Sequence, residues 1–102
     1  MNEEIMDKDS ILQLIRANRN IIEGKGVISV ALFGSFSTNR FTDSSDIDLM
    51  INFQNGLKNF DNFMDLAFYL EDLFGRKVEL VTPESVSDAF LSEISKEMIY
   101  AY

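Results

Sequence analysis

The chain has 102 residues, of which 46% are apolar, and it carries a formal net charge of -8 without any histidine or cysteine. This length supports one modest core, so we expect residues 1–102 to form a single domain, and the lack of cysteine excludes disulfides and thiolate metal sites. Because the nine basic residues are scattered, direct binding to nucleic acid is disfavoured, whereas the acidic balance favours a basic protein partner or a cationic small molecule.

The N-terminal stretch, Met1-Asn2-Glu3-Glu4, is acidic, and no long apolar run follows it. Signal peptides and membrane spans both need such a run. We therefore expect no leader and no membrane segment, and the protein is predicted to be cytoplasmic.

The first regular element that the sequence predicts is a helix from Ser10 to Glu23. Its apolar residues recur near helical spacing, Gly24 follows as a stop signal, and Ser10 with Gln13 could form a capping box at its start. We expect this helix to be scaffold.

A buried strand is predicted from Val27 to Phe33, where the sequence is almost unbroken in its apolar character. The strand ends at Gly34-Ser35. Glycine permits a sharp turn and the close approach of a ligand, and Ser35 could cap a helical turn that follows. Backbone N–H groups at the start of such a turn attract anions, so this turn is a candidate phosphate cradle.

A second strand, from Asp46 to Phe53, carries two carboxylates. Apolar residues alternate with Asp46 and Asp48, which is the period-two pattern of a strand with one buried face. The two aspartates therefore point the same way, with Cα atoms about 6.6 Å apart, and could converge on a cation that relieves their repulsion. Such oxygen ligands suit Mg²⁺, which leaves its other positions to water and substrate phosphate. For an isolated Asp-x-Asp pair, a solvated strand face is the more ordinary interpretation.

The second half of the chain is predicted to be a helix, a strand and a further helical part. Turn signals precede a helix from Phe60 to Phe74 that ends at Gly75. Its core-facing stripe is expected to consist of Phe60, Phe63, Met64, Ala67, Leu70 and Phe74. Residues 77–81 form a third strand with Glu79 on the face opposite its apolar residues, Thr82 and Pro83 open the next turn, and a terminal helix is expected from Ser87 through Met98.

These motifs resemble a known signature when they are taken together. Gly34-Ser35, the twelve-residue offset from Gly34 to Asp46, and the run Ser45-Asp46-Ile47-Asp48-Leu49 are similar to the DNA polymerase β-type nucleotidyltransferase superfamily, most closely its minimal nucleotidyltransferase (MNT) branch. The stretch 73–83, in which a helix ends at glycine and a strand carries a third acid, resembles the same branch. The resemblance covers most of the chain and implies an α+β fold of the polymerase β palm type, with a small mixed β-sheet flanked by helices.

The resemblance also implies roles for individual residues. Asp46 and Asp48 would bridge two Mg²⁺ ions, and Glu79 would complete the second metal site and could take the proton of the acceptor. Gly34 and Ser35 would hold the departing pyrophosphate. The reaction would be the transfer of AMP from ATP, in which catalysis is mostly positioning and charge neutralisation.

Several positions depart from the pattern of many relatives, which read Gly-Ser-Arg-Ala-Arg-Gly. Phe36 and Thr38 stand in place of the two arginines, Asn39 stands in place of the closing glycine, and Glu79 replaces the commoner aspartate. Asn39 can adopt the positive φ of a glycine, and Arg40 could bind the nucleotide in place of part of the lost charge. A slow or silent enzyme, with Glu79 as an ordinary exposed strand carboxylate, is the alternative.

The cellular role comes only from the resemblance. Stand-alone MNT proteins of this size are similar to the antitoxins of HEPN/MNT toxin–antitoxin pairs, in which the MNT protein binds a HEPN ribonuclease and active members transfer AMP to one of its tyrosines. This implies a Mg²⁺-dependent protein adenylyltransferase with a HEPN-type ribonuclease toxin as its partner. Two alternatives stay open: a small-molecule nucleotidyltransferase, acting for instance on aminoglycosides, and a non-catalytic module that neutralises its partner by contact.

Overall fold

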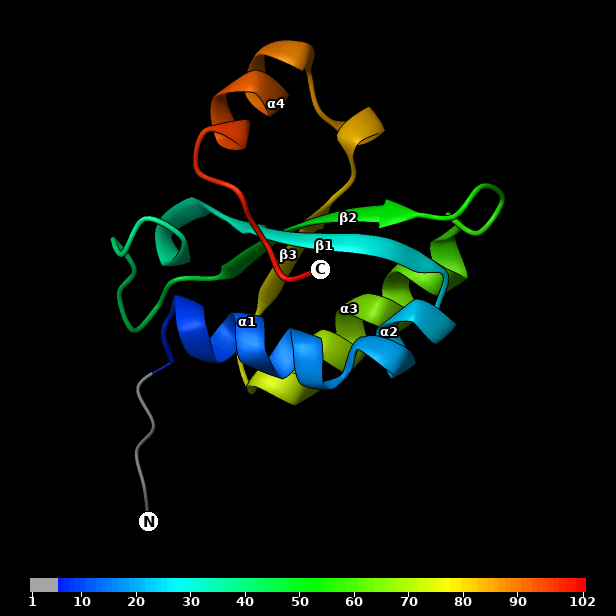
Figure 1. Cartoon of the computed structure of the whole chain (residues 1–102), viewed down its shortest axis with the longest axis horizontal. Helices are drawn as coiled ribbons and strands as arrows, with labels where there is room; N and C mark the ends of the chain where they lie inside the picture. The colour runs from blue at the N-terminus through cyan, green and yellow to red at the C-terminus, as the bar shows by residue number, and fades with distance from the viewer. Residues whose placement is uncertain (1–5) are drawn as a thin grey trace.

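The computed structural model describes residues 6–102, so the expectation for Met1 to Glu4 lies outside the described residues (Figure 1). No helix in this part of the chain combines the length and the apolar composition that a bilayer crossing requires. In chain order the elements are α1 (Lys8–Ala17), α2 (Arg19–Gly24), β1 (Val27–Phe33), the 3₁₀ turn η1 (Gly34–Phe36), β2 (Ile47–Phe53), α3 (Phe60–Phe74), β3 (Val78–Val81), the 3₁₀ turn η2 (Pro83–Ser85), α4 (Asp88–Ser95) and β4 (Ile99–Tyr100).

Four strands form one mixed sheet in the order β3-β2-β1-β4. β1 pairs antiparallel with β2 and β4, whereas β2 and β3 run parallel, because α3 carries the chain back between them. The predicted fold class is confirmed. The sequence did not indicate β4: the terminal helix ends at Ser95 instead of continuing through Met98, and the chain then returns to the free edge of β1.

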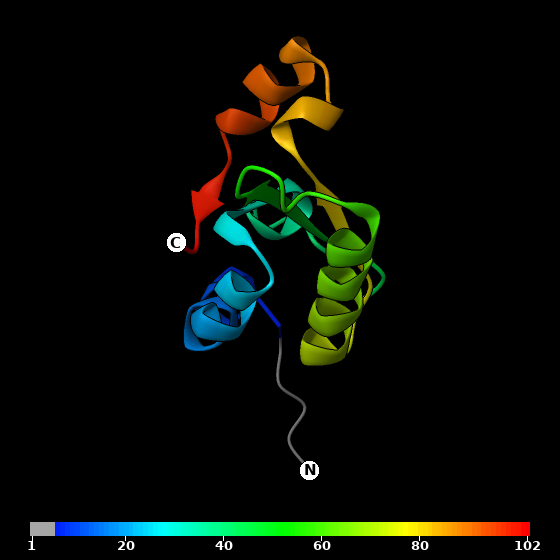
Figure 2. The same ribbon diagram turned by 90° about the vertical axis from the view of Figure 1, so that its right-hand side faces the viewer.

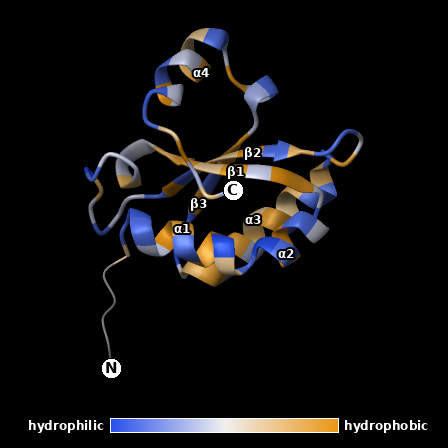
Figure 3. Ribbon diagram, viewed as in Figure 1, coloured by the Kyte–Doolittle hydropathy of each residue, from blue (hydrophilic) through white to orange (hydrophobic). Residues whose placement is uncertain are grey.

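Helices cover the two faces of the sheet unequally. α1, α2 and α3 lie against one face, and α4 stands over the other (Figures 1 and 2). Between the sheet and the three-helix layer lies the larger core, which includes the fully buried Ile11, Ile15, Val30, Leu32, Leu49, Ile51, Leu66 and Leu70 (Figure 3). A smaller cluster of Ala31, Phe33, Met50 and Ile94 lies on the α4 side. The prediction of a single buried face for β2 was therefore wrong, because Met50 is only 2% exposed beneath α4.

The predicted helix from Ser10 to Glu23 is interrupted at Asn18, which separates α1 from α2. The side-chain amide of Asn18 donates to the carbonyl of Leu14 at 2.8 Å, and its oxygen accepts from the hydroxyl of Tyr69 at 3.0 Å. A side chain that donates a hydrogen bond to a carbonyl one turn earlier in the same helix competes with the regular helical hydrogen bonds. The bend follows from a tertiary contact that the helical periodicity could not reveal.

The predicted capping box of Ser10 and Gln13 was also wrong. α1 begins earlier, and its cap is Asp7, whose carboxylate accepts from the Ser10 amide at 2.9 Å. The Ser10 hydroxyl in turn accepts from the Asp7 amide at 3.0 Å. The reciprocal pairing is the same in kind as the predicted box, but it is shifted by three residues.

The bounds of α3 agree with the prediction. The side chain of Asn59 accepts from an amide in the first turn, and Gly75 ends the helix with a φ of 64°. The buried face of α3 was only partly predicted: Leu66 and Leu70 are fully buried, whereas Phe60 is 76% exposed. Phe60 is the first residue of the helix and projects away from the sheet, so its assignment to the core is corrected.

The segment after β3 begins as predicted, with Pro83 in the first position of a turn. This turn is the short η2 and not the start of the terminal helix. Its capping oxygen belongs to Ser85, which accepts from the Thr82 amide at 3.1 Å. The terminal helix α4 starts separately, where Ser87 accepts from the amide of Phe90 at 3.1 Å.

Candidate active site

The turn after β1 brings the backbone against Asp48. Gly34 has a φ of 78°, which residues with side chains rarely adopt, and a Cβ at this position would lie 3.0 Å from Cγ of Asp48. Only glycine therefore allows the backbone to pass so close to the carboxylate. The Gly34 carbonyl then accepts from the amides of Ser37 at 3.1 Å and Thr38 at 3.2 Å, which closes η1.

Ser35 does not cap this turn, contrary to the prediction. The turn begins one residue earlier than expected, at Gly34, so that Ser35 lies within it and Phe33 occupies the cap position without a side-chain hydrogen bond. The first amides of such a turn have no acceptor inside it. The backbone amides at the start of η1 are therefore free to bind phosphate as far as the turn itself is concerned. The role of Gly34 and Ser35 in binding a nucleotide stays a prediction.

The loop that joins this turn to the acids is held by packing and by one arginine. Phe36 is fully buried and stacks on Phe41, with ring centroids 4.4 Å apart. The guanidinium of Arg76 lies 5.3 Å from the centre of the Phe36 ring and donates to the carbonyls of Asp43 at 2.9 Å and Ser45 at 2.8 Å. Arg76, which the sequence analysis did not single out, thus fixes the backbone immediately before Asp46.

The departures from the common motif have separate structural outcomes. Asn39 has a φ of 62°, which confirms that it can take the place of the closing glycine. Thr38 is exposed, and its hydroxyl donates to the Gly34 carbonyl at 3.2 Å, so it supports the turn. Phe36 contributes to the core and supplies no charge. Arg40 is exposed, its amide donates to the Ser35 carbonyl at 2.8 Å, and the nucleotide contact of its side chain stays a prediction.

The carboxylates of Asp48 and Glu79 meet across two neighbouring strands. Asp48 lies directly opposite Glu79 in the parallel pairing of β2 and β3, and opposite Phe33 in β1. Paired residues share a face of the sheet, and Phe33 belongs to the cluster beneath α4. The acids therefore lie on the α4 side. Asp46, which was predicted to be the first residue of the strand, instead lies one position before β2 and is half-buried.

Burial and neighbouring acids both disfavour the charged form of Asp48, and burial has the larger effect. Burial of Asp48, together with the charge of Glu79 and a hydrogen bond to it, and the charges of Asp46 and Glu97, raises the pKa of Asp48 from 3.8 to about 6. Glu97 was not among the predicted site residues. The sequence could not indicate it, because it reaches Asp48 only through the chain's return to β4.

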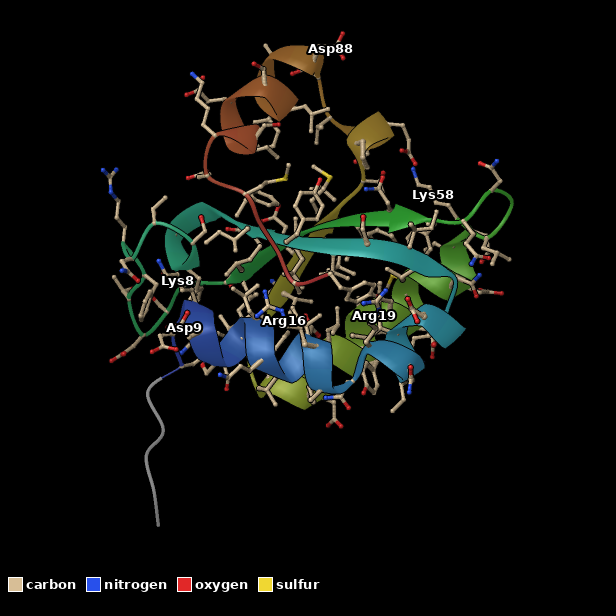
Figure 4. All side chains as sticks on the ribbon, in the orientation of Figure 1. Lys8, Asp9, Arg16, Arg19, Lys58 and Asp88 are labelled. Carbon is tan, nitrogen blue, oxygen red and sulfur yellow. The ribbon has the colours of Figure 1, made fainter. Side chains whose placement is uncertain are left out.

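The C-terminal strand β4 is held in place by Arg16 of α1, on the other side of the sheet. Nε of Arg16 donates to the carbonyl of Ala101 at 2.7 Å, and its Nη2 donates to that of Tyr100 at 3.2 Å. Figure 4 shows Arg16 on the helices that lie across the sheet from α4. The arginine thus anchors the last strand, and the segment before that strand carries Glu97 toward Asp48.

The acidic side chains are of the type that binds a metal ion, but among the described residues they do not lie close enough together to form a complete site. Within residues 6–102, no group of three acidic side chains is arranged closely enough to hold a metal ion. Asp48 and Glu79 nevertheless offer paired carboxylate oxygens, and Mg²⁺ commonly takes only one or two carboxylates from a protein. Their repulsion is what a cation would relieve. A site that also includes Asp46, and a second ion, stay predictions.

Comparison with known proteins indicates the same family as the sequence motifs do, and it does so over most of the chain. A model of the family described as polymerase beta, nucleotidyltransferase, matches residues 11–102. A candidate protein adenylyltransferase of Methanocaldococcus jannaschii is 36% identical over 93 residues, which cover 88% of this chain and 93% of that protein. A solved structure described as a candidate minimal nucleotidyltransferase has a TM-score of 0.73 at 26% identity and covers 95% of this chain and 98% of its own.

A further solved structure is a complex of a tri-AMPylated Shewanella oneidensis HEPN toxin with an MNT antitoxin. Its matching chain has a TM-score of 0.63 at 21% identity, over 89% of this chain and 71% of that one, which shows a shared fold. The family model extends from α1 through the last strand, so it includes the glycine turn and every acid of the site. With the 36% identical relative, this shows that the chain belongs to the polymerase beta nucleotidyltransferase family.

Proposed function

We propose that this protein is a Mg²⁺-dependent adenylyltransferase that transfers AMP from ATP to a tyrosine hydroxyl of a HEPN-type ribonuclease, and so acts as its antitoxin. One observation carries the proposal: the Gly34 turn lies against Asp48, and Asp48 stands opposite Glu79. Phosphates bound at the turn would lie beside the carboxylates that serve the metal. The similarity to a candidate protein adenylyltransferase and to the fold found in a toxin–antitoxin complex supports the choice of a protein acceptor.

Asp46, Asp48 and Glu79 are the residues that would hold Mg²⁺. When bound, Mg²⁺ neutralises phosphate charge and lowers the pKa of an acceptor hydroxyl. The chain's own contribution is to keep the carboxylates together despite their repulsion, on a sheet whose strands are paired on both sides of Asp48. A rigid strand pair fixes their positions more tightly than a loop would.

The transfer forms a bond between the acceptor oxygen and the α-phosphorus of ATP. The bond from that phosphorus to the bridging oxygen breaks, and pyrophosphate leaves. Glu79 is exposed, so it can meet an incoming hydroxyl and accept its proton on a carboxylate oxygen. The first amides of η1 and the hydroxyl of Ser35 would hold the pyrophosphate, with Arg40 as the nearest cation along the chain.

AMP transfer explains inhibition in simple electrostatic terms. Each transferred group adds about one negative charge to a tyrosine, and a negative charge near an RNA-binding site repels RNA phosphate. The net charge of -8 on this chain would also speed its encounter with a basic ribonuclease at low salt.

The test is co-expression with the product of the neighbouring gene, which the proposal expects to be a HEPN-type ribonuclease, followed by the intact mass of both proteins. We expect the mass increment of AMP on the ribonuclease. Asp46→Asn and Asp48→Asn should abolish the increment without unfolding the chain, whereas Asp43→Asn, an exposed acid in the preceding loop with the same charge change, should retain it.

Two other outcomes would redirect the assignment. If Asp48→Asn still inhibits the ribonuclease fully and the wild type adds no mass, the protein neutralises its partner by contact alone. If labelled ATP modifies an aminoglycoside but no ribonuclease, the acceptor is a small cation, which also suits the acidic surface.

A further inference from the structure

The outward side of α3 carries an apolar ridge. Phe60, Met64 and Phe68 are spaced four residues apart, which places them along one ridge of the helix surface. Phe60 is 76% exposed and Phe68 is 62% exposed. Figure 2 shows α3 at the edge of the molecule, with α1 and α2 on its other side and α4 across the sheet. Exposed aromatic rings of this size are typical of protein interfaces.

A surface hollow continues the ridge at the start of α3. It has a volume of about 260 Å³ and is lined by Lys58, Asn59, Phe60 and Phe63. Lys58 at its margin is paired with Glu84 at 3.0 Å. The ridge and the hollow together form an apolar surface against which a partner's side chains could pack.

Carboxylates line one side of the ridge. Asp65 and Asp72 lie three residues before and four residues after Phe68, and Asp61 lies two turns before it, so all three are on the same side of the helix. Asp65 is paired with Lys25 at 2.7 Å. Asp61 and Asp72 are exposed and take part in no salt bridge within residues 6–102. Asp72 beside Phe68, and Asp61 two turns before it, are thus not neutralised by ion pairs within residues 6–102.

We propose that this surface, the Phe60–Phe68 ridge with its carboxylates, is where the chain docks the basic ribonuclease of the proposed function, on which this inference rests. Burying the ridge from Phe60 to Phe68 would also desolvate Asp61 and Asp72, which is favourable only if the partner supplies Lys or Arg side chains around an apolar socket. The partner surface is therefore apolar at its centre and basic at its rim.

The ridge and the acids lie on different faces of the sheet. α3 packs under the face opposite α4, whereas Asp48 and Glu79 lie on the α4 face. Glu79 belongs to β3, which is the edge strand beside α3. A ribonuclease held at α3 would therefore need only to pass a tyrosine-bearing segment around that edge to reach Glu79. Docking and transfer use separate residues and can be removed separately.

The experiment measures binding of the purified ribonuclease by calorimetry, with AMP transfer at saturating ribonuclease as the second measurement. Phe68→Ser should weaken binding at least about tenfold, as loss of an interface aromatic does, and should leave transfer unchanged at saturation. Phe60→Ser is the second variant. Ile21→Ser, which removes an apolar side chain that is 50% exposed on α2, is the matched control and should bind like the wild type.

Separate variants test whether the carboxylates beside the ridge contribute to docking. Asp61→Asn combined with Asp72→Asn should slow association at low salt, and the difference should vanish at high salt. Asp9→Asn combined with Asp88→Asn makes the same change in net charge on α1 and α4, which do not belong to the ridge, and should have a smaller effect.

Each outcome has a distinct meaning. If the wild type binds and modifies the ribonuclease but the two phenylalanine variants bind equally well, the docking surface is refuted and the proposed function stands. If the wild type neither binds nor modifies it, the proposed function fails and the docking surface fails with it. If the variants instead abolish self-association seen by light scattering, the ridge joins two copies of this chain and the proposal is overturned.

Discussion

Asp48→Asn should stabilise the protein even as it abolishes transfer. The pKa of Asp48 is raised from 3.8 to about 6 in the folded state, first by burial and then by Glu79. Between these two pH values the folded state binds more protons than the unfolded state, so the free energy of unfolding falls as pH rises through this window. Above this pH window Asp48 is charged in both states, and the full reduction in the free energy of unfolding is present.

The size of that cost follows from the shift. A shift of about two pKa units corresponds to roughly 3 kcal/mol, and the half-buried position of Asp48 reduces this through solvent screening to about 1–2 kcal/mol. We therefore expect Asp48→Asn to raise the free energy of unfolding by about 1–2 kcal/mol near pH 7.5, which is a gain of several degrees in Tm for a domain of this size. Near pH 4 the gain should disappear.

Urea denaturation at both pH values, without divalent cations, measures this directly. Asp43→Asn, whose carboxylate lies in the exposed loop, is the control and should show no such pH-dependent gain. Mg²⁺ should then stabilise the wild type and not Asp48→Asn, since a ligand that binds only the folded state raises its stability by an amount that grows with the logarithm of its affinity. A variant that is less stable than the wild type near pH 7.5 would refute the conclusion that the charged Asp48 destabilises the fold.

Three further predictions concern the neighbours of Asp48. Glu79→Gln should lower transfer at least about tenfold, as loss of a general base does, while Glu79→Asp should keep measurable activity with labelled ATP; wild-type activity in Glu79→Gln would make this acid a bystander. Arg76→Ala should cost about 2 kcal/mol, from two charged hydrogen bonds and a ring contact, and should speed hydrogen exchange of residues 39–46, with Arg76→Lys restoring only part of the protection; equal exchange rates would disprove its anchoring role. Gly34→Ala should cost about 2 kcal/mol, because it adds a strained φ and a contact with Asp48, and an unchanged denaturation midpoint would contradict this.

Signals that lie close together in the sequence predicted the structure well. The strand from Val27 to Phe33 and the helix from Phe60 to Phe74 have the bounds that their periodicity and flanking residues indicated. The opposition of Asp48 and Glu79 agrees with the resemblance, since both acids belong to neighbouring strands. Local propensity, capping and alternation suffice where each element carries its own start and stop.

Features that depend on distant contacts could not be predicted in the same way. Arg76 reaches loop carbonyls more than thirty residues away, and Glu97 approaches Asp48 only because β4 returns to β1. The exposure of Phe60 was missed because helical spacing shows that residues share a face, but not how far that face is covered. The interruption at Asn18 could not be predicted because its hydrogen-bond partner, Tyr69, lies in another helix.

The pairing of two repelling carboxylates is maintained by their apolar neighbours. In the register that sets Asp48 opposite Glu79, Ile47 lies beside Val78 and Leu49 beside Leu80, all facing the larger core. A slip of one residue would turn Glu79 toward that core and expose the apolar side chains. Burial of each such side chain contributes about 1.5–3 kcal/mol, so together they outweigh the cost of about 1–2 kcal/mol that burial and repulsion impose on the charged Asp48. The core therefore holds in place an arrangement of charges that would not form by itself and that a cation could use.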